Sequence, residues 1–303
     1  EVIKPQHPIS HSHLLMATTL SEETIWIADG GSTKAQWALM QAGRCVATAT
    51  TIGVNPLLTD AASIATGMGA ALLAHEAFAQ SQPHHIYYYG AGCIHQGIDH
   101  MQQALLTLRS EATVHVASDM LGAARALCGQ HDGIACILGT GSNSALYIKG
   151  EIADQVSPLG YILGDEGSGA VLGKLLLNAI LKRRWPANLL QAFDAAYGTT
   201  QAEVIQHVYR EPAANRYLGS FTPFLAAHRH EPEVHRLLVE EFGRFIDHNL
   251  RHYQRPDLPL HFTGSIAYHF QAELVEAATE RGFTVAQVLQ APLEGLCRYH
   301  AAT

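Results

Sequence analysis

The chain has 303 residues, of which 48% are hydrophobic and 15% charged, and this predicts two packed domains rather than a disordered chain. A net charge of -8, with 19 histidines counted as neutral, argues against nucleic-acid binding, and no apolar run is long enough to predict a membrane span. Five scattered cysteines without a CxxC pair argue against zinc and iron–sulfur sites and fit free thiols in a reducing cytoplasm.

The N-terminal part begins with a segment that we expect to carry no fold. Residues 1–21 contain three histidines, two prolines and an apolar patch too short for a signal sequence, so they are expected to be a disordered extension. Residues 25–40 then read IWIADGGSTKAQWALM, which predicts a strand, a turn rich in Gly, Ser and Thr, and a second strand.

Strand-like and helix-like stretches alternate after this hairpin, and this order predicts an α/β architecture with mixed sheets. The predicted elements are a strand at 45–51, a helix from Asp60 to about Gln80, a strand at 85–90, a helix at 98–109, a strand at 112–118 and a helix capped by Asp119.

The second half opens on a copy of the first hairpin, ACILGTGSNSALYI at 135–148. A repeat at this spacing predicts two similar halves rather than a solenoid, so we expect domains at 22–117 and 118–303. The remaining predicted elements are a helix from Asp165 to about Lys182, a helix with the capping box Thr200–Glu203, a long helix at 232–252, a strand, turn and helix within 257–270, and a closing helix from Pro292.

The first Gly-rich turn has residue types suited to a phosphate group. Glycines let a ligand approach the backbone, hydroxyls and backbone N–H groups can surround phosphate oxygens, and a carboxylate at the strand end can hold a hydrated Mg²⁺. These residues are Asp29, Gly30, Gly31, Ser32, Thr33 and Lys34. A tight hairpin with Asp as a turn residue is the alternative, and the GxxxxGK[ST] pattern of a P-loop is absent.

Two further turns resemble the first in composition. Gly139, Thr140, Gly141, Ser142 and Asn143 lie between the strands of the second hairpin, and two such turns could hold a polyphosphate from both sides. Gly264 and Ser265 follow a strand and open a helix, where free N–H groups could meet a phosphate or a ribose. A plain helix cap is the alternative for this third turn.

Two carboxylates and one amide are candidates for direct contact with a substrate. Asp119 follows a strand beside the expected domain boundary and could accept a proton from a substrate hydroxyl. Asp165 lies in the glycine-rich stretch GDEGSG, and Asn55 in GVNPLL could hydrogen-bond a sugar. Ordinary helix caps and an Asx turn are the alternatives for these residues.

The motifs IADGGSTKAQWAL, ILGTGSNSALY, GYILGDEGSG and FTGSIA, in this order, resemble the BadF/BadG/BcrA/BcrD ATPase family. The N-acetylglucosamine-kinase-like branch is the most similar, and the family belongs to the actin/hexokinase/Hsp70 superfamily. The resemblance spans roughly residues 24–300. It implies two ribonuclease-H-like domains, a cleft that takes ATP and Mg²⁺, and a last helix that crosses back to the N-terminal domain.

The resemblance also implies a role for individual residues. Asp119 matches the general base, Asp29 the residue that positions Mg²⁺ through water, and Thr33, Thr140, Gly264 and Ser265 match residues of the ATP motifs. The residues that match the amino-sugar contacts are Asn55, Ser142, Asn143, Gly160 and Asp165.

The stretch SPLGYILGDEGSG departs from animal N-acetylglucosamine kinases, which carry an aromatic residue before the glycine, so the exact sugar stays open. N-Acetylglucosamine, N-acetylmuramic acid and glucosamine all keep a free 6-hydroxyl. A non-catalytic ATP-dependent sugar sensor or switch is the alternative from another functional class. The sequence does not define the oligomeric state, and a homodimer stays open.

Overall fold

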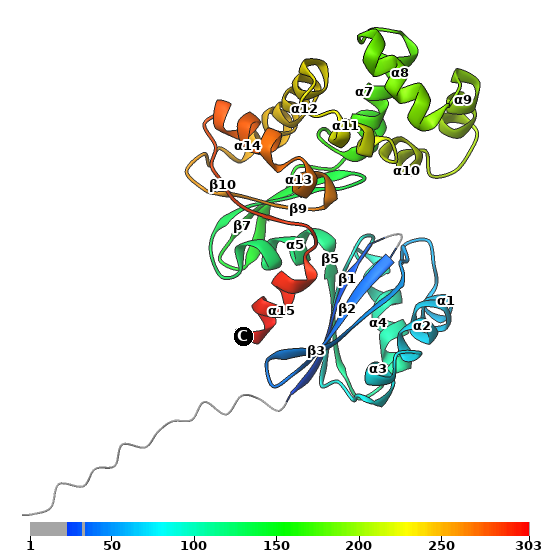
Figure 1. Ribbon diagram of the computed structural model, residues 1–303. Helices are drawn as coiled ribbons and strands as arrows, with labels where there is room; N and C mark the ends of the chain where they lie inside the picture. The colour runs from blue at the N-terminus through cyan, green and yellow to red at the C-terminus, as the bar shows by residue number, and fades with distance from the viewer. Residues whose placement is uncertain (1–22, 32–33, 303) are drawn as a thin grey trace, which may run out of the picture.

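The chain folds into two mixed five-stranded sheets, each flanked by helices (Figure 1). The computed structural model describes residues 23–31 and 34–302. The extension predicted at 1–21 and the turn residues Ser32 and Thr33 therefore lie outside the described residues. Among the described residues, no helix combines the length and apolar character that crossing a membrane requires.

The first sheet has the strand order β3-β2-β1-β4-β5. Strand β2 pairs antiparallel with both β1 and β3, while β1, β4 and β5 run parallel to one another. Its core contains Trp26 and Trp37, both fully buried. The strands are β1 (Thr24–Gly30), β2 (Lys34–Gln41), β3 (Arg44–Ile52), β4 (His85–Gly90) and β5 (Thr113–Ser118).

Helices cover one face of this sheet (Figure 1). Asp60 caps the first of these helices as predicted, since its Oδ1 accepts from the Ser63 N–H at 2.9 Å. The predicted single helix to Gln80 is wrong in detail, since it is interrupted at His75, where the backbone turns extended. The elements are α1 (Ala61–Ile64), η1 (Ala65–Gly69), α2 (Ala70–Leu73), α3 (Glu76–Gln80) and α4 (Gln96–Leu108).

The second sheet repeats this arrangement. Its order is β10-β9-β6-β7-β8, so the hairpin strand β6 again has an antiparallel partner on one side and a parallel partner on the other. The prediction of two similar halves is confirmed by this shared topology. The strands are β6 (Gly133–Leu138), β7 (Ser142–Ile148), β8 (Glu151–Asp154), β9 (Leu260–Thr263) and β10 (Val285–Leu289).

The second half carries a larger helical layer (Figure 1). Thr200 and Glu203 form the predicted capping box, and the predicted helix at 232–252 continues from α12 into a π turn and a 3₁₀ turn. The elements are α6 (Gly160–Leu163), α7 (Gly169–Leu181), α8 (Ala187–Tyr197), α9 (Gln201–Tyr209), α10 (Ala214–Gly219), α11 (Thr222–Ala227), α12 (Pro232–Phe245), η2 (Ile246–Leu250), η3 (Arg251–Tyr253), α13 (Ser265–His269) and α14 (Gln271–Glu280).

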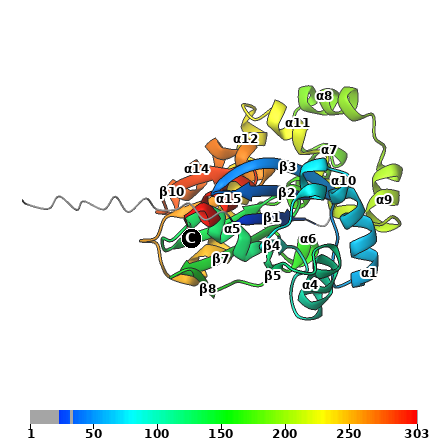
Figure 2. The same ribbon diagram turned by 90° about the horizontal axis from the view of Figure 1, so that it is seen from below.

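Two helices join the halves. Helix α5 (Asp119–Cys128) contacts β4 of the first sheet and β6 of the second, and α15 (Leu293–Ala301) packs on α5 and on β1 to β3 (Figure 2). A Cβ at Gly295 would lie 2.4 Å from the Ala126 carbonyl oxygen, so only glycine allows this approach of α15 to α5. The limits 22–117 and 118–303 stay a prediction.

Candidate active site

A cleft of about 770 Å³ lies where the Gly-rich turns of the two halves meet. Its lining comes from β1, β2, α5, the turn after β6, α10, the turn after β9, and the segment before α15. The predicted residues that line it together are Asp29, Gly30, Gly31, Lys34, Asp119, Thr140, Gly141, Gly264 and Ser265. Residues far apart in the sequence therefore form one site, whereas Ser32 and Thr33 lie outside the described residues.

The first turn is held tightly by its own sheet. The Gly31 N–H donates to the Lys34 carbonyl at 2.9 Å, which closes the hairpin. A Cβ at Gly30 would lie 2.2 Å from the Tyr88 hydroxyl, so no larger residue fits without moving this buried tyrosine. Glycine at position 30 therefore lets the Tyr88 side chain approach the backbone next to Asp29.

The second turn is fixed through its carbonyl groups. The Gly139 and Thr140 carbonyls accept from the Gly169 and Ala170 N–H groups at 2.8 and 3.1 Å, so the start of α7 holds the turn from behind. No described residue accepts from the N–H groups of Thr140 and Gly141. Both residues line the cleft, and their N–H groups are therefore available to phosphate oxygens.

The third turn lies directly against the second. Gly264 has φ of +113°, and a Cβ there would lie 2.3 Å from the Leu138 carbonyl oxygen, immediately before the second turn. The Thr263 hydroxyl beside it is buried and has no hydrogen-bond partner among the described residues. A buried hydroxyl without a partner is unfavourable, so Thr263 is a further candidate for ligand contact that the sequence did not single out.

Asp119 does not cap its helix, which corrects the sequence-based expectation. Ser118 is the N-cap of α5, and its hydroxyl accepts from the Leu121 N–H at 3.2 Å. Asp119 is instead the first helical residue, and its Oδ1 accepts from its neighbour Met120 at 2.9 Å. Because a serine already satisfies the helix end, the carboxylate of Asp119 is free to serve the cleft.

Both carboxylates of the cleft have raised pKa values. Burial raises the pKa of Asp29 to about 6, with the charge of Asp119 as the second cause and Lys34 acting in the opposite direction. Burial also raises the pKa of Asp119. Two partly buried acids that share one cleft are a common arrangement at catalytic sites.

This donor set fits a hydrated Mg²⁺ ion. Magnesium typically binds one or two carboxylates and keeps several waters and phosphate oxygens as its other ligands. The described residues contain no group of three or more histidines, cysteines or acids placed to hold a metal ion. Asp29, with Asp119 in the same cleft, supplies the one or two carboxylates that a hydrated Mg²⁺ ion uses.

The raised pKa of Asp29 predicts a pH-dependent stability. An Asp whose pKa is higher in the folded than in the unfolded state stabilises folding only while it is protonated, so the wild type should lose stability as the pH rises from 4 through 6. Asp29→Asn should remove this pH-dependent loss of stability, because asparagine does not ionise. We expect the variant to match the wild type below pH 4 and to exceed it by up to about 3 kcal/mol at pH 8 without ligands. Urea unfolding at pH 4, 6 and 8 tests this, and a constant difference across these pH values would contradict it.

A smaller pocket of about 130 Å³ adjoins the second turn and collects several predicted sugar contacts. Ser142, Asn143 and Asp165 line it, and Gly160 opens the short helix α6 beside it. The Asp165 Oδ1 accepts from the Ser142 N–H at 3.3 Å, so this carboxylate connects the pocket to the phosphate turn.

Asp165 does not open a helix, contrary to the prediction. Helix α7 begins at Gly169, and its N-cap is Ser168, whose hydroxyl accepts from the Val171 N–H at 3.3 Å. Asp165 itself has φ of +55°, a conformation that residues other than glycine rarely adopt and that is often found at functional sites.

Asn55 is not brought to either pocket. Its Oδ1 accepts from the Leu57 N–H at 3.1 Å and lies against Gly92, which is the Asx turn that the sequence analysis kept as an alternative. It lines neither the cleft nor the smaller pocket. A role for Asn55 in sugar binding stays a prediction.

Sequence reasoning missed several residues of the cleft. Gln36 lies two residues after Lys34 on β2, so strand alternation could have placed it on the same face. Asn215 and Arg216 come from α10, which follows Ala213 with its unusual φ of +61°, and no motif marks this segment. Gln290 follows β10 at the corresponding edge of the sheet.

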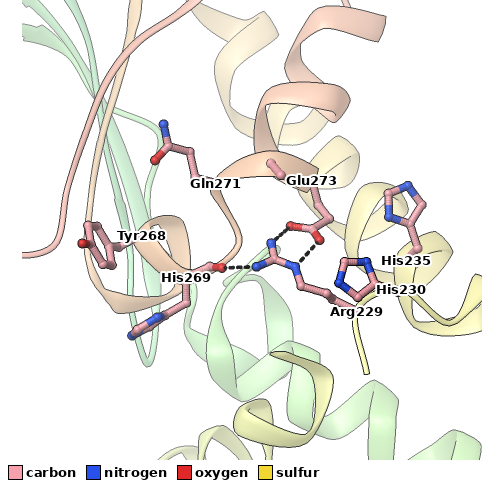
Figure 3. A pocket seen from close by; sticks show the side chains of 8 residues that line it. Arg229, His230, His235, Tyr268, His269, Gln271 and Glu273 are labelled. Atoms are coloured by element: carbon pink, nitrogen blue, oxygen red, sulfur yellow. Dashed lines mark hydrogen bonds and ion pairs between the residues drawn. The ribbon is translucent and has the colours of Figure 1, made fainter. Parts of the chain in front are cut away.

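A separate pocket lies on the helical layer of the second half (Figure 3). Arg229 forms a two-bonded ion pair with Glu273 and donates to the His269 carbonyl, so its charge is already compensated. None of the predicted site residues lines this pocket. Its histidines do not form a metal-binding group within the described part of the chain.

Comparison with known proteins agrees with this geometry. A structure from Porphyromonas gingivalis described as a "putative N-acetylglucosamine kinase" is 46% identical, covers 92% of this chain and 99% of its own, and superposes with a TM-score of 0.88. One from Chromobacterium violaceum with the same description is 22% identical (91% and 98% covered, TM-score 0.67). A ROK family glucokinase from Streptomyces griseus, solved with glucose and AMPPNP, is 15% identical (92% and 98% covered, TM-score 0.54).

The similarity to the Chromobacterium violaceum and Streptomyces griseus structures shows the fold alone. No family model and no curated protein matches the chain. The duplicated sheets and the cleft between their hairpins define a two-domain protein of the actin/hexokinase fold. Within that fold, the 46% identity over 92% of the chain shows to which family the chain belongs. The chain belongs to the N-acetylglucosamine-kinase-like branch of the BadF/BadG/BcrA/BcrD ATPase family.

Proposed function

We propose that the protein is an ATP-dependent kinase that phosphorylates the 6-hydroxyl of an N-acetylated amino sugar. The observation that carries this proposal is the convergence of three Gly-rich turns and Asp119 on one cleft. The relatives support the substrate class, since the 46% identical protein is described as a "putative N-acetylglucosamine kinase", and the kinases that share the fold imply ATP as the phosphoryl donor.

In the proposed reaction Asp119 accepts the proton of the sugar hydroxyl while that oxygen attacks the γ-phosphate in line. A carboxyl with a raised pKa takes up a proton more readily than an ordinary Asp, which suits a general base. The N–H groups of Thr140 and Gly141 bind phosphate oxygens and stabilise the charge of the transferring group. Asp29 would hold Mg²⁺ through water, and bound Mg²⁺ neutralises charge on the phosphates.

The sugar is proposed to lie between Asp119 and the smaller pocket. Asp165, Ser142 and Asn143 would then bind its hydroxyl and acetamido groups. N-Acetylglucosamine is our first choice and N-acetylmuramic acid the second. We propose the cytoplasm as the compartment, because the five cysteines of the described residues are all free thiols.

A coupled assay of ADP release tests the proposal. The purified protein with Mg·ATP is given N-acetylglucosamine, N-acetylmuramic acid, glucosamine, glucose or no sugar. We expect release with one N-acetylated sugar far above the reaction without sugar. If no sugar raises ADP release but sugars still change ATP binding, the alternative of a non-catalytic switch is favoured instead.

A further inference from the structure

We propose that Cys45 and Cys297 form a thiol pair that closes reversibly into an intramolecular disulfide on exposure to a small-molecule disulfide such as oxidised glutathione. Neither residue lines the cleft or the pocket beside it. The site is therefore a modification site that does not depend on the proposed kinase reaction.

The pairing of β2 with β3 places the exposed Cys45 beside a residue that packs against the last helix. Cys45 lies opposite Met40 in the antiparallel register, next to a register shift between Leu39 and Met40. Residues opposite each other in such a pair project to the same face of the sheet, with Cβ atoms about 5 Å apart. Met40 is buried in one cluster with Leu296 of α15, against which Cys297 packs. Cys45 and Cys297 thus share the interface between the sheet and α15.

The two thiol groups are neighbours across this interface. The Cys45 thiol donates to the Ala47 carbonyl at 3.5 Å and lies close enough to Cys297 to raise the pKa of that thiol. Helix α15 contacts strand β3 directly, as Figure 2 also shows. Cys128 also lies close enough to Cys136 to raise its pKa, but both of these thiols are buried, as is Cys93, whereas Cys45 is exposed to a dissolved disulfide.

Exposure decides which thiol reacts first. Cys45 is open to solvent, while Cys297 is partly buried, and burial, followed by the charge of Cys45, raises the pKa of Cys297 to about 12. A thiol with a high pKa holds little thiolate, the reactive form. Cys45 is therefore the attacking group and Cys297 the resolving one.

The reaction consists of two thiol–disulfide exchanges. The Cys45 thiolate attacks one sulfur of oxidised glutathione, which forms a mixed disulfide and releases one glutathione thiolate. The Cys297 thiolate, after losing its proton to solvent, attacks the Cys45 sulfur and expels the second glutathione thiolate. The protein loses two thiol protons and two electrons, and one oxidised glutathione is reduced to two glutathione molecules.

The bond would fasten the C-terminal helix to the edge of the first sheet. Helix α15 directly follows Gln290, Ala291 and Pro292 of the cleft and packs on α5, the helix that begins with Asp119. A crosslink that closes so long a loop restricts the unfolded chain strongly, so we expect the oxidised protein to unfold at a Tm higher by roughly 5 °C.

Peptide mapping of the full chain after treatment with oxidised glutathione tests the proposal. We expect a Cys45–Cys297 crosslinked peptide, the loss of two reactive thiols, and full reversal by dithiothreitol. In Cys297→Ser, Cys45 should instead retain glutathione, and the Tm should not rise. Cys136→Ala, which removes a buried thiol of the second sheet, should leave the crosslink unchanged.

Three outcomes would overturn the proposal. They are free thiols at both positions after treatment, a stable glutathione adduct on Cys45 in the wild type, and a crosslink between two chains rather than within one. The mapping of the wild type alone distinguishes these outcomes, so the proposal can be rejected even if a variant fails to fold. Kinase activity does not enter the measurement.

Discussion

Asp119→Asn is expected to lower kcat for sugar phosphorylation by at least about 100-fold, because the amide cannot accept the proton of the attacking hydroxyl. Asn has almost the same shape as Asp, and Ser118 rather than Asp119 caps α5, so the helix should keep its start. The affinities for ATP and sugar should change much less than kcat. Steady-state kinetics of ADP release with saturating substrates, together with calorimetric binding of sugar, measure both quantities.

Asp99→Asn provides the matched control for this variant. Asp99 lies exposed in the first turn of α4 and does not line the cleft, so this variant removes one negative charge without touching the site. Its kcat should stay within a factor of two of the wild-type value. A kcat of Asp119→Asn close to that of Asp99→Asn would reject Asp119 as the general base, while the kinase proposal itself would stand if the wild type phosphorylates sugar.

The repeated hairpin explains why so much of the fold could be predicted. ADGGSTK and LGTGSNS each follow an apolar strand, and this local pattern was enough to predict two similar halves, which the shared strand order confirms. Asp60 and the pair Thr200–Glu203 were also predicted correctly, since a cap depends only on residues within one helical turn. Such features are encoded locally.

Two of the errors concern residues that have a competing helix cap within three residues. Asp119 and Asp165 were both expected to begin helices, yet Ser118 and Ser168 cap those helices instead. Ser and Asp are nearly equal as caps, so propensity alone cannot choose between neighbours. The outcome depends on the tertiary structure, which directs Asp119 to the cleft and Asp165 to the turn at Ser142.

Arg216 and Cys297 show a different limit. Arg216 reaches the cleft only because α10 packs closely on α7, where a Cβ at Gly173 would lie 1.8 Å from the Leu218 carbonyl oxygen. Cys297 comes near Cys45 only because the last helix returns to the first sheet. Long-range packing of this kind leaves no local pattern in the sequence, so neither residue could be predicted.

Gly264→Ala is expected to destabilise the protein by at least about 2 kcal/mol and to weaken ATP binding as well. Two effects add at this residue. The backbone has φ of +113°, which side chains rarely permit, and the new Cβ would lie 2.3 Å from the Leu138 carbonyl oxygen. To relieve this contact, the third turn must move away from the second, and both turns line the proposed ATP site. Urea unfolding measures the stability, and calorimetry with a non-hydrolysable ATP analogue measures the affinity.

Gly282→Ala separates the two effects. Gly282 also has a positive φ, +79°, but a Cβ there would meet no atom within 4 Å, and the residue lies outside the cleft. This variant should lose only the backbone contribution, about 1 kcal/mol, and should bind the analogue as the wild type does. If Gly264→Ala is no less stable than Gly282→Ala, the close contact with Leu138 is unimportant. If it loses stability but binds the analogue normally, the third turn does not belong to the nucleotide site, and the site is confined to the two hairpin turns.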